Sequence, residues 1–303
     1  MSYHVPVLLK QSVEGLNIQT GGIYVDVTFG GGGHAKAIFE QMEQGTLIAF
    51  DQDPDATQNI ASFESDGQRS FIFVASNFRH LKRYLKFHKI DKVDGILADL
   101  GVSSHQFDQQ SRGFSTRFDG ALDMRMDQVS ANTAAKVVNE YSEEVLIQLL
   151  SRYGEIRNAK RLASEIISAR STAPIQTTAT LKSIAMKSAP NGKHSKYLAQ
   201  LFQAIRIEVN DEINALKEFL TQSKDVLKVG GRLVIISYHS LEDRLAKFLI
   251  NTGNLDGMLE KDFYGNVIRP FEPIKGRLIT PAENEIALNN RARSAKLRIG
   301  IKN

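Results

Sequence analysis

The sequence predicts an α/β fold, in which a doubly wound, mostly parallel sheet is interrupted by a mainly helical insertion. Short β-forming segments alternate with helical periodicity in the first third, only helical periodicity follows through the middle, and a β pattern returns after Gly231. We therefore expect a discontinuous sheet domain of residues 1–105 and 197–303. Residues 106–196 form the expected insertion, which is too long for a loop and is assigned to substrate recognition.

Four strand-like segments open the chain, and helical patterns alternate with the first of them. The expected strands are Ile23–Thr28, Thr46–Phe50, Phe71–Ala75 and Gly95–Asp99, and the expected helices are Ala35–Glu43 and Pro54–Phe63. This rhythm is typical of a parallel sheet, in which ligands bind outside the carboxyl ends of the strands.

Helical patterns dominate the middle of the chain. Ser142 is the expected N-cap of one helix, with Glu143 and Glu144 in its first turn, and Asn158–Arg170 is a second helix. Apolar residues from Leu198 to Leu220 recur with the spacing of one long amphipathic helix.

The last third returns to the sheet. RLVIISYH, which ends at His239, reads as a strand, and Ser240 with Asp243 as a capping box for the next helix. The alternating SAKLRIGIK, which ends at Lys302, is expected to be a final edge strand.

Composition narrows the class of protein. The 303 residues include 42% hydrophobic and 24% charged residues, as in globular proteins, and no cysteine, so disulfides, thiolate zinc sites and cysteine nucleophiles are excluded. No apolar run is long enough for a membrane span, and the N-terminus lacks the pattern of a secretory signal. We expect a cytoplasmic protein without a metal ion, and the sequence leaves a monomer and a homodimer both open.

The distribution of charge indicates a polyanionic partner. The net charge is +4, yet residues 152–206 contain ten Lys or Arg against two acidic residues, and residues 289–303 contain five basic residues and no acidic one. The rest of the chain is therefore acidic. Two basic blocks on such a protein are consistent with a nucleic-acid-binding face, and equally with solvated helix surfaces.

Four consecutive glycines, Gly30–Gly33, separate the first strand from the first helix. A tight turn needs one or two glycines, so four favour a ligand that approaches the backbone. Gly30, Gly32 and Ala35 fit the loose dinucleotide pattern G-x-G-x-x-A. Asp26 precedes the turn, and it would repel a pyrophosphate but attract the ammonium of S-adenosylmethionine, which tilts the choice towards that cofactor.

Polar residues follow the other strands at the same expected edge. Asp51 is placed to accept hydrogen bonds from ribose hydroxyls, whereas Asp53 before Pro54 reads as a helix cap. Phe78 is equally consistent with an adenine contact and with core packing. Asp99 ends the fourth strand, where it faces the same crevice, and is a candidate for cofactor binding or catalysis.

Nine stretches of the chain together resemble the bacterial 16S ribosomal RNA cytosine-N4 methyltransferase family (RsmH/MraW type). They are HVPVLL (4–9), DVTFGGGGH (26–34), DQDP (51–54), DGILADLGVSSHQFD (94–108), RGFS (112–115), LDMRMD (122–127), FQAIRIEVNDE (202–212), ISYHSLEDR (236–244) and RARSAKLR (291–298). His105 and Asn290 stand where the family typically has proline.

The resemblance implies a Rossmann-like methyltransferase fold, S-adenosylmethionine as cofactor, and methylation of the exocyclic N4 amine of one cytidine. The implied substrate is cytosine 1402 (ribosomal RNA numbering) of 16S rRNA within the small ribosomal subunit. The family's cofactor residues correspond to Gly32, Gly33, His34, Asp51, Phe78, Asp99 and Gln106. Gln106 enters the set through the resemblance alone.

Methylation of cytosine N4 needs in-line geometry and an acceptor for the departing proton. We expect Asp99 in that role, with Ser103 or Ser104 orienting the amine; binding of the methionine ammonium is the alternative role for Asp99. A base that leaves its stack needs aromatic and arginine surfaces, and the chain's basic blocks would contact phosphates. The candidate substrate-binding residues are Phe107, Arg112, Phe114, Arg117, Arg125, His239, Arg244, Arg291 and Arg293.

Two other classes of protein share part of these features. A nicotinamide-dependent oxidoreductase would have the same fold and glycine turn. A non-catalytic RNA-binding or ribosome-assembly protein would have the basic blocks, but it would not need the glycine turn together with Asp51.

Overall fold

The computed structural model describes residues 6–274 and 278–303 of the chain. Its internal contacts divide it into two compact units, which are described separately. A sheet unit contains residues 1–101 and 213–303, and a helical unit contains residues 102–212. The boundaries expected from the sequence were 105/106 and 196/197. The difference at the second boundary arises because α9 (His194–Val209) packs in the core of the helical unit.

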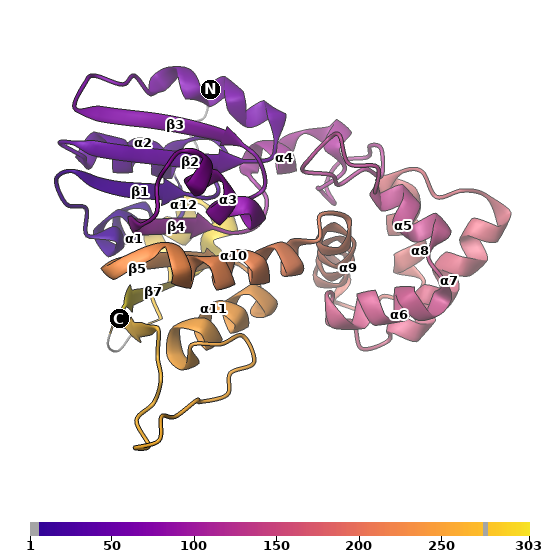
Figure 1. Ribbon diagram of the computed structural model, residues 1–303. Helices are drawn as coiled ribbons and strands as arrows, with labels where there is room; N and C mark the ends of the chain where they lie inside the picture. Colours follow the sequence, from indigo (N-terminus) through magenta and orange to yellow (C-terminus); the bar gives the residue numbers. More distant parts are fainter. Residues whose placement is uncertain (1–5, 275–277) are drawn as a thin grey trace. The chain divides into compact units, whose positions relative to one another are not determined.

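The sheet unit contains seven strands in the order β3-β2-β1-β4-β5-β7-β6, and Figure 1 shows their arrangement. The strands are β1 (Gly22–Asp26), β2 (Gly45–Asp51), β3 (Arg69–Ala75), β4 (Val93–Asp99), β5 (Leu227–Ser237), β6 (Phe271–Pro273) and β7 (Lys296–Lys302). The first five pair in parallel, and β7 runs antiparallel to both of its neighbours. The predicted parallel sheet is thus confirmed.

The expectation for the last strand was wrong in one respect. β7 lies between β5 and β6, so it is an interior strand of the sheet and not an edge strand. The edge beyond it is the three-residue β6, which is too short to give a recognisable pattern in the sequence.

Helices connect the strands of this unit. They are α1 (Leu9–Leu16), α2 (Gly33–Gln41), α3 (Leu81–Phe87), α10 (Glu212–Val226), α11 (Ser240–Thr252) and α12 (Glu283–Leu288), with 3-10 turns η1 (Pro54–Ser62), η2 (Phe78–His80) and η4 (Asn290–Ser294). Pro54–Phe63 was expected to be helical and forms a 3-10 helix whose first residue is proline. The predicted cap is confirmed there, because Asp53 accepts a hydrogen bond from the N–H of Asp55 (3.1 Å).

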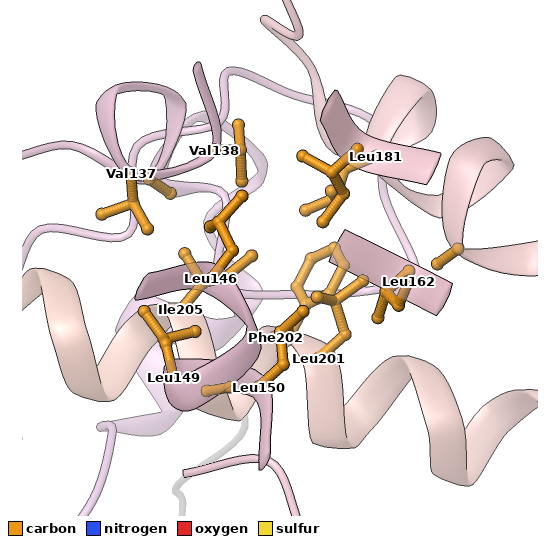
Figure 2. Close-up of a cluster of buried hydrophobic side chains, with 14 of the residues drawn as sticks. Val137, Val138, Leu146, Leu149, Leu150, Leu162, Leu181, Leu201, Phe202 and Ile205 are labelled. Atoms are coloured by element: carbon orange, nitrogen blue, oxygen red, sulfur yellow. The ribbon is translucent and has the colours of Figure 1, made fainter. Parts of the chain in front are cut away.

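The helical unit contains α4 (Ser104–Asp108), η3 (Gln110–Arg112), α5 (Ala134–Glu140), α6 (Glu143–Arg152), α7 (Ala159–Thr172), α8 (Thr178–Met186) and α9. Its core is a cluster of aliphatic and aromatic side chains, drawn in Figure 2 around Leu146, Leu150 and Phe202. Ser142 caps α6 as predicted, with its side chain accepting from the N–H of Val145.

The single long helix expected between Leu198 and Leu220 is two helices, α9 and α10. Asp211 interrupts them with a left-handed backbone (φ +50°). The side chain of Asn210 accepts a hydrogen bond from the N–H of Met126 (2.7 Å) and donates one to the carbonyl of Met124 (2.7 Å). The amphipathic pattern continues across this break because each helix has its own buried face, so periodicity alone could not locate it.

None of the helices in the described part of the chain is long and apolar enough to span a membrane.

Candidate cofactor and active site

Three aspartates end three neighbouring parallel strands of the sheet unit. Asp26 ends β1, Asp51 ends β2 and Asp99 ends β4, and β1 pairs with both of the other strands. Because the strands are parallel, the three carboxyl groups lie at one edge of the sheet. This edge is where the sequence predicted the ligand site.

The glycine turn lies directly after β1, and its glycines differ in what the fold requires. Gly30 and Gly32 have left-handed backbones (φ +50° and +75°), which favour glycine. At Gly33 a side chain would meet the ring of Pro6 at 2.3 Å, whereas at Gly31 it would enter open space. The fold therefore needs three of the four glycines for its own geometry. Gly31 is the remaining position, where the absence of a side chain leaves the backbone open to an approaching ligand.

Asp51 organises this turn. Its carboxylate accepts hydrogen bonds from the N–H of Gly30 (2.7 Å) and from the N–H of Asp53 (2.8 Å). The side-chain amide of Asn59 donates a second hydrogen bond to the turn, from Nδ2 to the carbonyl of Gly30 (3.1 Å). Burial raises the pKa of Asp51 to about 6, although the two backbone donors oppose that rise.

Asp26 is the most buried of the three carboxyl groups, with 1% of its surface exposed. Its Oδ1 accepts from the N–H of Thr28 (3.0 Å), and its Oδ2 has no hydrogen-bond partner in the described part of the chain. Burial, with a smaller contribution from the charge of Asp51, raises its pKa to about 7. A buried carboxylate oxygen that lacks a donor fits a ligand that brings a cationic group, and it does not fit a pyrophosphate.

Asp99 retains an exposed face, with 22% of its side chain accessible. Its Oδ1 accepts a hydrogen bond from the hydroxyl of Tyr238 (2.8 Å), and its Oδ2 lies 3.7 Å from Nδ1 of His34. Its backbone N–H donates to the hydroxyl of Thr28 (2.7 Å). Burial raises the pKa of Asp99 to about 7, and the Tyr238 hydrogen bond opposes this rise.

Tyr238 was not among the site residues predicted from the sequence. It follows β5, which lies beside β4 in the sheet, and Leu100 donates to the carbonyl of Ile236 across this pair. The available signal was its position at the carboxyl end of a strand, but the order of the strands was needed to place it beside Asp99.

His34 and Phe78 complete the predicted cofactor residues in this unit. The ring of His34 is buried, with Nε2 lying 3.1 Å from the carbonyl of Val7. The half-buried ring of Phe78 packs edge-on against Phe219 of α10, with centroids 5.5 Å apart. Phe78 therefore has the packing role that the sequence left open, and its contact with adenine stays a prediction.

Ser103 and Gln106 belong to the helical unit, where they cap α4 together. Ser103 accepts from the N–H of Gln106 (3.2 Å), and the Gln106 side chain accepts from the N–H of Ser103 (3.1 Å). The side chain of Ser104 lies outside the described residues. The roles of these residues towards cofactor and amine stay predictions.

Three of the candidate substrate residues are engaged inside the helical unit. Arg112 is buried and donates to the carbonyls of Arg125 and Met126, and Phe114 lies in the hydrophobic core. Arg125 pairs with Asp123 (2.7 Å). Phe107 is half-buried and Arg117 is exposed. Arg117 is thus the most accessible of these for a contact with RNA.

The remaining candidates lie in the sheet unit. Arg244 and Arg293 are exposed, and Arg291 and His239 are half-buried. Nε2 of His239 lies 3.0 Å from the carboxylate of Glu242. All four stay predictions for substrate contact.

The predicted Ser240–Asp243 capping box was wrong. His239 is the N-cap residue of α11, and Glu242 accepts from the N–H groups of Tyr238 (2.9 Å) and His239 (3.4 Å). Asp243 instead binds Arg298 (2.6 Å) and Lys296 (3.3 Å) of β7. The N-cap therefore lies one residue before the predicted Ser240. The buried carboxylate of Glu242 accounts for this, because it also accepts from the N–H of Tyr238, which directly follows β5.

A basic hollow lies in the helical unit. Its volume is about 430 Å³, and its lining includes Arg157, Lys193 and Lys196 against the single acidic residue Glu155. Asn158 and Lys193, which precede the first residues of α7 and α9, also line it. Helix N-termini and cations attract anions, so this part of the basic block can bind phosphate groups.

The strand order, the antiparallel β7, the glycine turn after β1 and the acidic strand ends define a Rossmann-like methyltransferase. Comparison with known proteins extends this class to a family, because the model of the MraW methylase family matches residues 1–303. The chain belongs to this family.

Curated relatives match over nearly their whole length. The chain is 57% identical to Ribosomal RNA small subunit methyltransferase H of Amoebophilus asiaticus over 299 residues, 99% of this chain and 96% of that protein. It is 54% identical to the protein of the same name from Cytophaga hutchinsonii, covering 98% of both chains. For that of Bacteroides thetaiotaomicron the identity is 52%, over 100% and 98% of the two chains.

Proposed function

We propose that the protein transfers a methyl group from S-adenosylmethionine to the exocyclic N4 amine of a cytidine, cytosine 1402, in 16S rRNA of the small ribosomal subunit. Three relatives that are 52–57% identical bear the name of a ribosomal RNA small subunit methyltransferase. The observation that carries the chemistry is Asp99, a carboxyl group with an accessible face at the carboxyl end of β4.

The sheet unit has the groups that this cofactor needs. Oδ2 of Asp26, buried and without a donor in the described part of the chain, complements the methionine ammonium. The open backbone at Gly31 admits the ligand to the turn. Asp51, fixed by two backbone donors, can accept from the ribose hydroxyls with its remaining lone pairs. A pyrophosphate would meet the negative charges of Asp26 and Asp51, which disfavours a nicotinamide cofactor.

The chemistry requires one proton acceptor. The cofactor supplies a methyl group activated by its positively charged sulfur. When the cytosine amine forms its bond to this methyl carbon, the carbon–sulfur bond breaks, the sulfur keeps that electron pair, and the amine carries an extra proton. Asp99 as a carboxylate accepts this proton. Since burial raises its pKa to about 7, Asp99 is a stronger base than an ordinary aspartate.

The helical unit and the exposed arginines provide for the RNA. Arg157, Lys193 and Lys196 line a hollow in the basic block, where they can hold backbone phosphates. Arg117 and Arg244 are exposed and can contact phosphates or stack on an unpaired base.

The experiment has a binding arm and a transfer arm. Calorimetry of the purified protein with S-adenosylmethionine and with NAD tests the cofactor; we expect binding of the former only, weakened by Asp51→Ala and unaffected by Asp91→Ala at an exposed carboxylate of the same unit. In the transfer arm, small subunits that lack the modification receive isotopically labelled methyl groups, and nuclease digestion with mass spectrometry locates the label. Label on cytosine N4 is the expected result.

Other outcomes separate the alternatives. Binding of NAD alone would establish the oxidoreductase reading. RNA binding without binding of either cofactor would favour the non-catalytic RNA-binding or ribosome-assembly protein. Label on an atom other than cytosine N4 would overturn the N4 assignment.

A further inference from the structure

The hydroxyl of Tyr238 contacts the carboxyl group of Asp99, the candidate proton acceptor, within the sheet unit. It donates a hydrogen bond of 2.8 Å to Oδ1 of Asp99. The bond joins the carboxyl ends of two adjacent parallel strands, since Tyr238 follows β5 and Asp99 ends β4. The pairing of β4 with β5 therefore brings these two residues together.

The backbone of Tyr238 is fixed independently of Asp99. Its N–H donates to the carboxylate of Glu242 (2.9 Å), a side chain in the first turn of α11 that is 4% exposed. The ring lies against Gly101, where an added side chain would meet Cδ2 of Tyr238 at 3.6 Å. The backbone hydrogen bond fixes where the side chain starts, and the partly buried ring packs against the hydrophobic core of the sheet unit.

We propose that Tyr238 is a positioning residue for methyl transfer, which acts through Asp99: its hydroxyl donates to the carboxylate of Asp99 and thereby sets the pH above which that carboxylate can accept the proton of the cytosine amine. The inference rests on the proposed function, because it concerns Asp99 as the acceptor. It assigns Tyr238 no contact with substrate or cofactor.

The neighbours of Asp99 determine the direction of the effect. Burial is the main cause that raises the pKa of Asp99, and the negative charges of Asp26 on β1 and Glu242 on α11 raise it further. His34 of α2 lies 3.7 Å from the other carboxylate oxygen. The hydrogen bond from Tyr238 stabilises the carboxylate and lowers that pKa. The hydroxyl stays protonated throughout, because burial and the adjacent carboxylates raise the pKa of Tyr238 far above its ordinary value.

Removal of the hydroxyl should therefore displace the acid limb of the rate profile to higher pH. A hydrogen bond to a charged group corresponds to roughly one to two pH units. If the limb moves from about pH 7 to about pH 8, the carboxylate fraction at pH 7 falls from about one half to about one tenth, a fivefold loss of rate. Near pH 9 the rate should return to within about twofold of the unchanged protein.

The test measures single-turnover methyl transfer to small subunits from pH 5.5 to pH 9, at saturating S-adenosylmethionine, for the unchanged protein and Tyr238→Phe. Tyr24→Phe is the matched control, because Tyr24 lies on β1 of the same unit and its hydroxyl accepts a hydrogen bond from the N–H of Gln19 (2.6 Å). A ring-fluorinated tyrosine at position 238, a stronger donor, should move the limb to lower pH. This second substitution keeps the ring and the hydrogen bond.

The outcomes are distinct. A limb displaced upwards by Tyr238→Phe, downwards by the fluorinated residue and not by Tyr24→Phe supports the proposal. A uniform loss at every pH, or an unmoved limb while Asp99→Asn abolishes transfer, overturns it and leaves the proposed function standing. If the unchanged protein places no methyl group on cytosine N4, the proposed function fails, and this inference fails with it.

Discussion

Replacement of Asp26 by asparagine should change the stability of the protein in a way that depends on pH. Asp26 is 1% exposed, and its pKa is raised from 3.8 to about 7 in the folded protein. The folded state therefore holds its proton up to a higher pH than the unfolded state does. It follows that this group lowers the free energy of unfolding as pH rises from about 4 to about 7, and lowers it no further above that range.

The magnitude follows from the two pKa values. A difference of about three units corresponds to about 4 kcal/mol, since each unit is worth about 1.4 kcal/mol. In Asp26→Asn an amide group replaces the carboxyl group, whose Oδ2 has no hydrogen-bond partner in the described part of the chain. The buried amide is left unsatisfied there, which lowers the free energy of unfolding by roughly 1–3 kcal/mol. That cost is the same at every pH. We therefore expect the stability difference, variant minus unchanged protein, to rise by up to about 4 kcal/mol between pH 4 and pH 8.

Urea titrations followed by circular dichroism at several pH values measure this difference, and Asp91→Asn, which removes an exposed carboxyl group of the same unit, is the control. With S-adenosylmethionine present, the advantage of Asp26→Asn at pH 8 should shrink, because the ligand's ammonium compensates only the carboxylate. Calorimetry should show at least about tenfold weaker binding. A stability difference that is constant with pH, or that falls as pH rises, would refute the reasoning about this buried carboxyl group.

Three further predictions concern other parts of the chain. Gly32→Ala places a side chain on a backbone with φ +75° and should destabilise the protein by about 1–2 kcal/mol in thermal unfolding, whereas Gly31→Ala should leave the melting temperature unchanged and weaken cofactor binding in calorimetry. Asp243→Ala removes two ion pairs between α11 and β7 and should lower the free energy of unfolding by about 1–2 kcal/mol without changing cofactor affinity. Lys193→Gln with Lys196→Gln should raise the KM for small subunits and reduce the salt dependence of RNA binding by about one to two in logarithmic slope.

Each of these has an outcome that contradicts it. Equal cofactor affinity of Gly31→Ala and the unchanged protein would remove the reason given for the fourth glycine. For Asp243, the sharpest control is Asp66→Ala, whose ion pair with Arg69 joins neighbouring residues on the surface and should matter less. For the lysines, the double variant Lys86→Gln with Lys89→Gln makes the same charge change at exposed positions of the sheet unit, outside both basic blocks, and an equal effect there would show that only net charge matters.

The sequence by itself determined the sheet and most of its ligand edge. β-forming runs and glycine turns are local features, so β1 to β4, the cap at Asp53 and the position of Asp51 and Asp99 at strand ends could be predicted. The four glycines indicated a ligand, and the structure adds that Gly31 is the one that the fold itself does not require.

Only the tertiary structure decided the features that depend on contacts between distant residues. Tyr238 and Asp99 are 139 positions apart and meet because β5 lies beside β4, an order that no local pattern encodes. Asn210 ends α9 by binding the backbone near Met126, and Asp243 binds β7 where its spacing suggested a helix cap. Periodicity reports which face of a segment is buried, whereas the partner that buries it, and the raised pKa that follows from burial, exist only once the chain has folded.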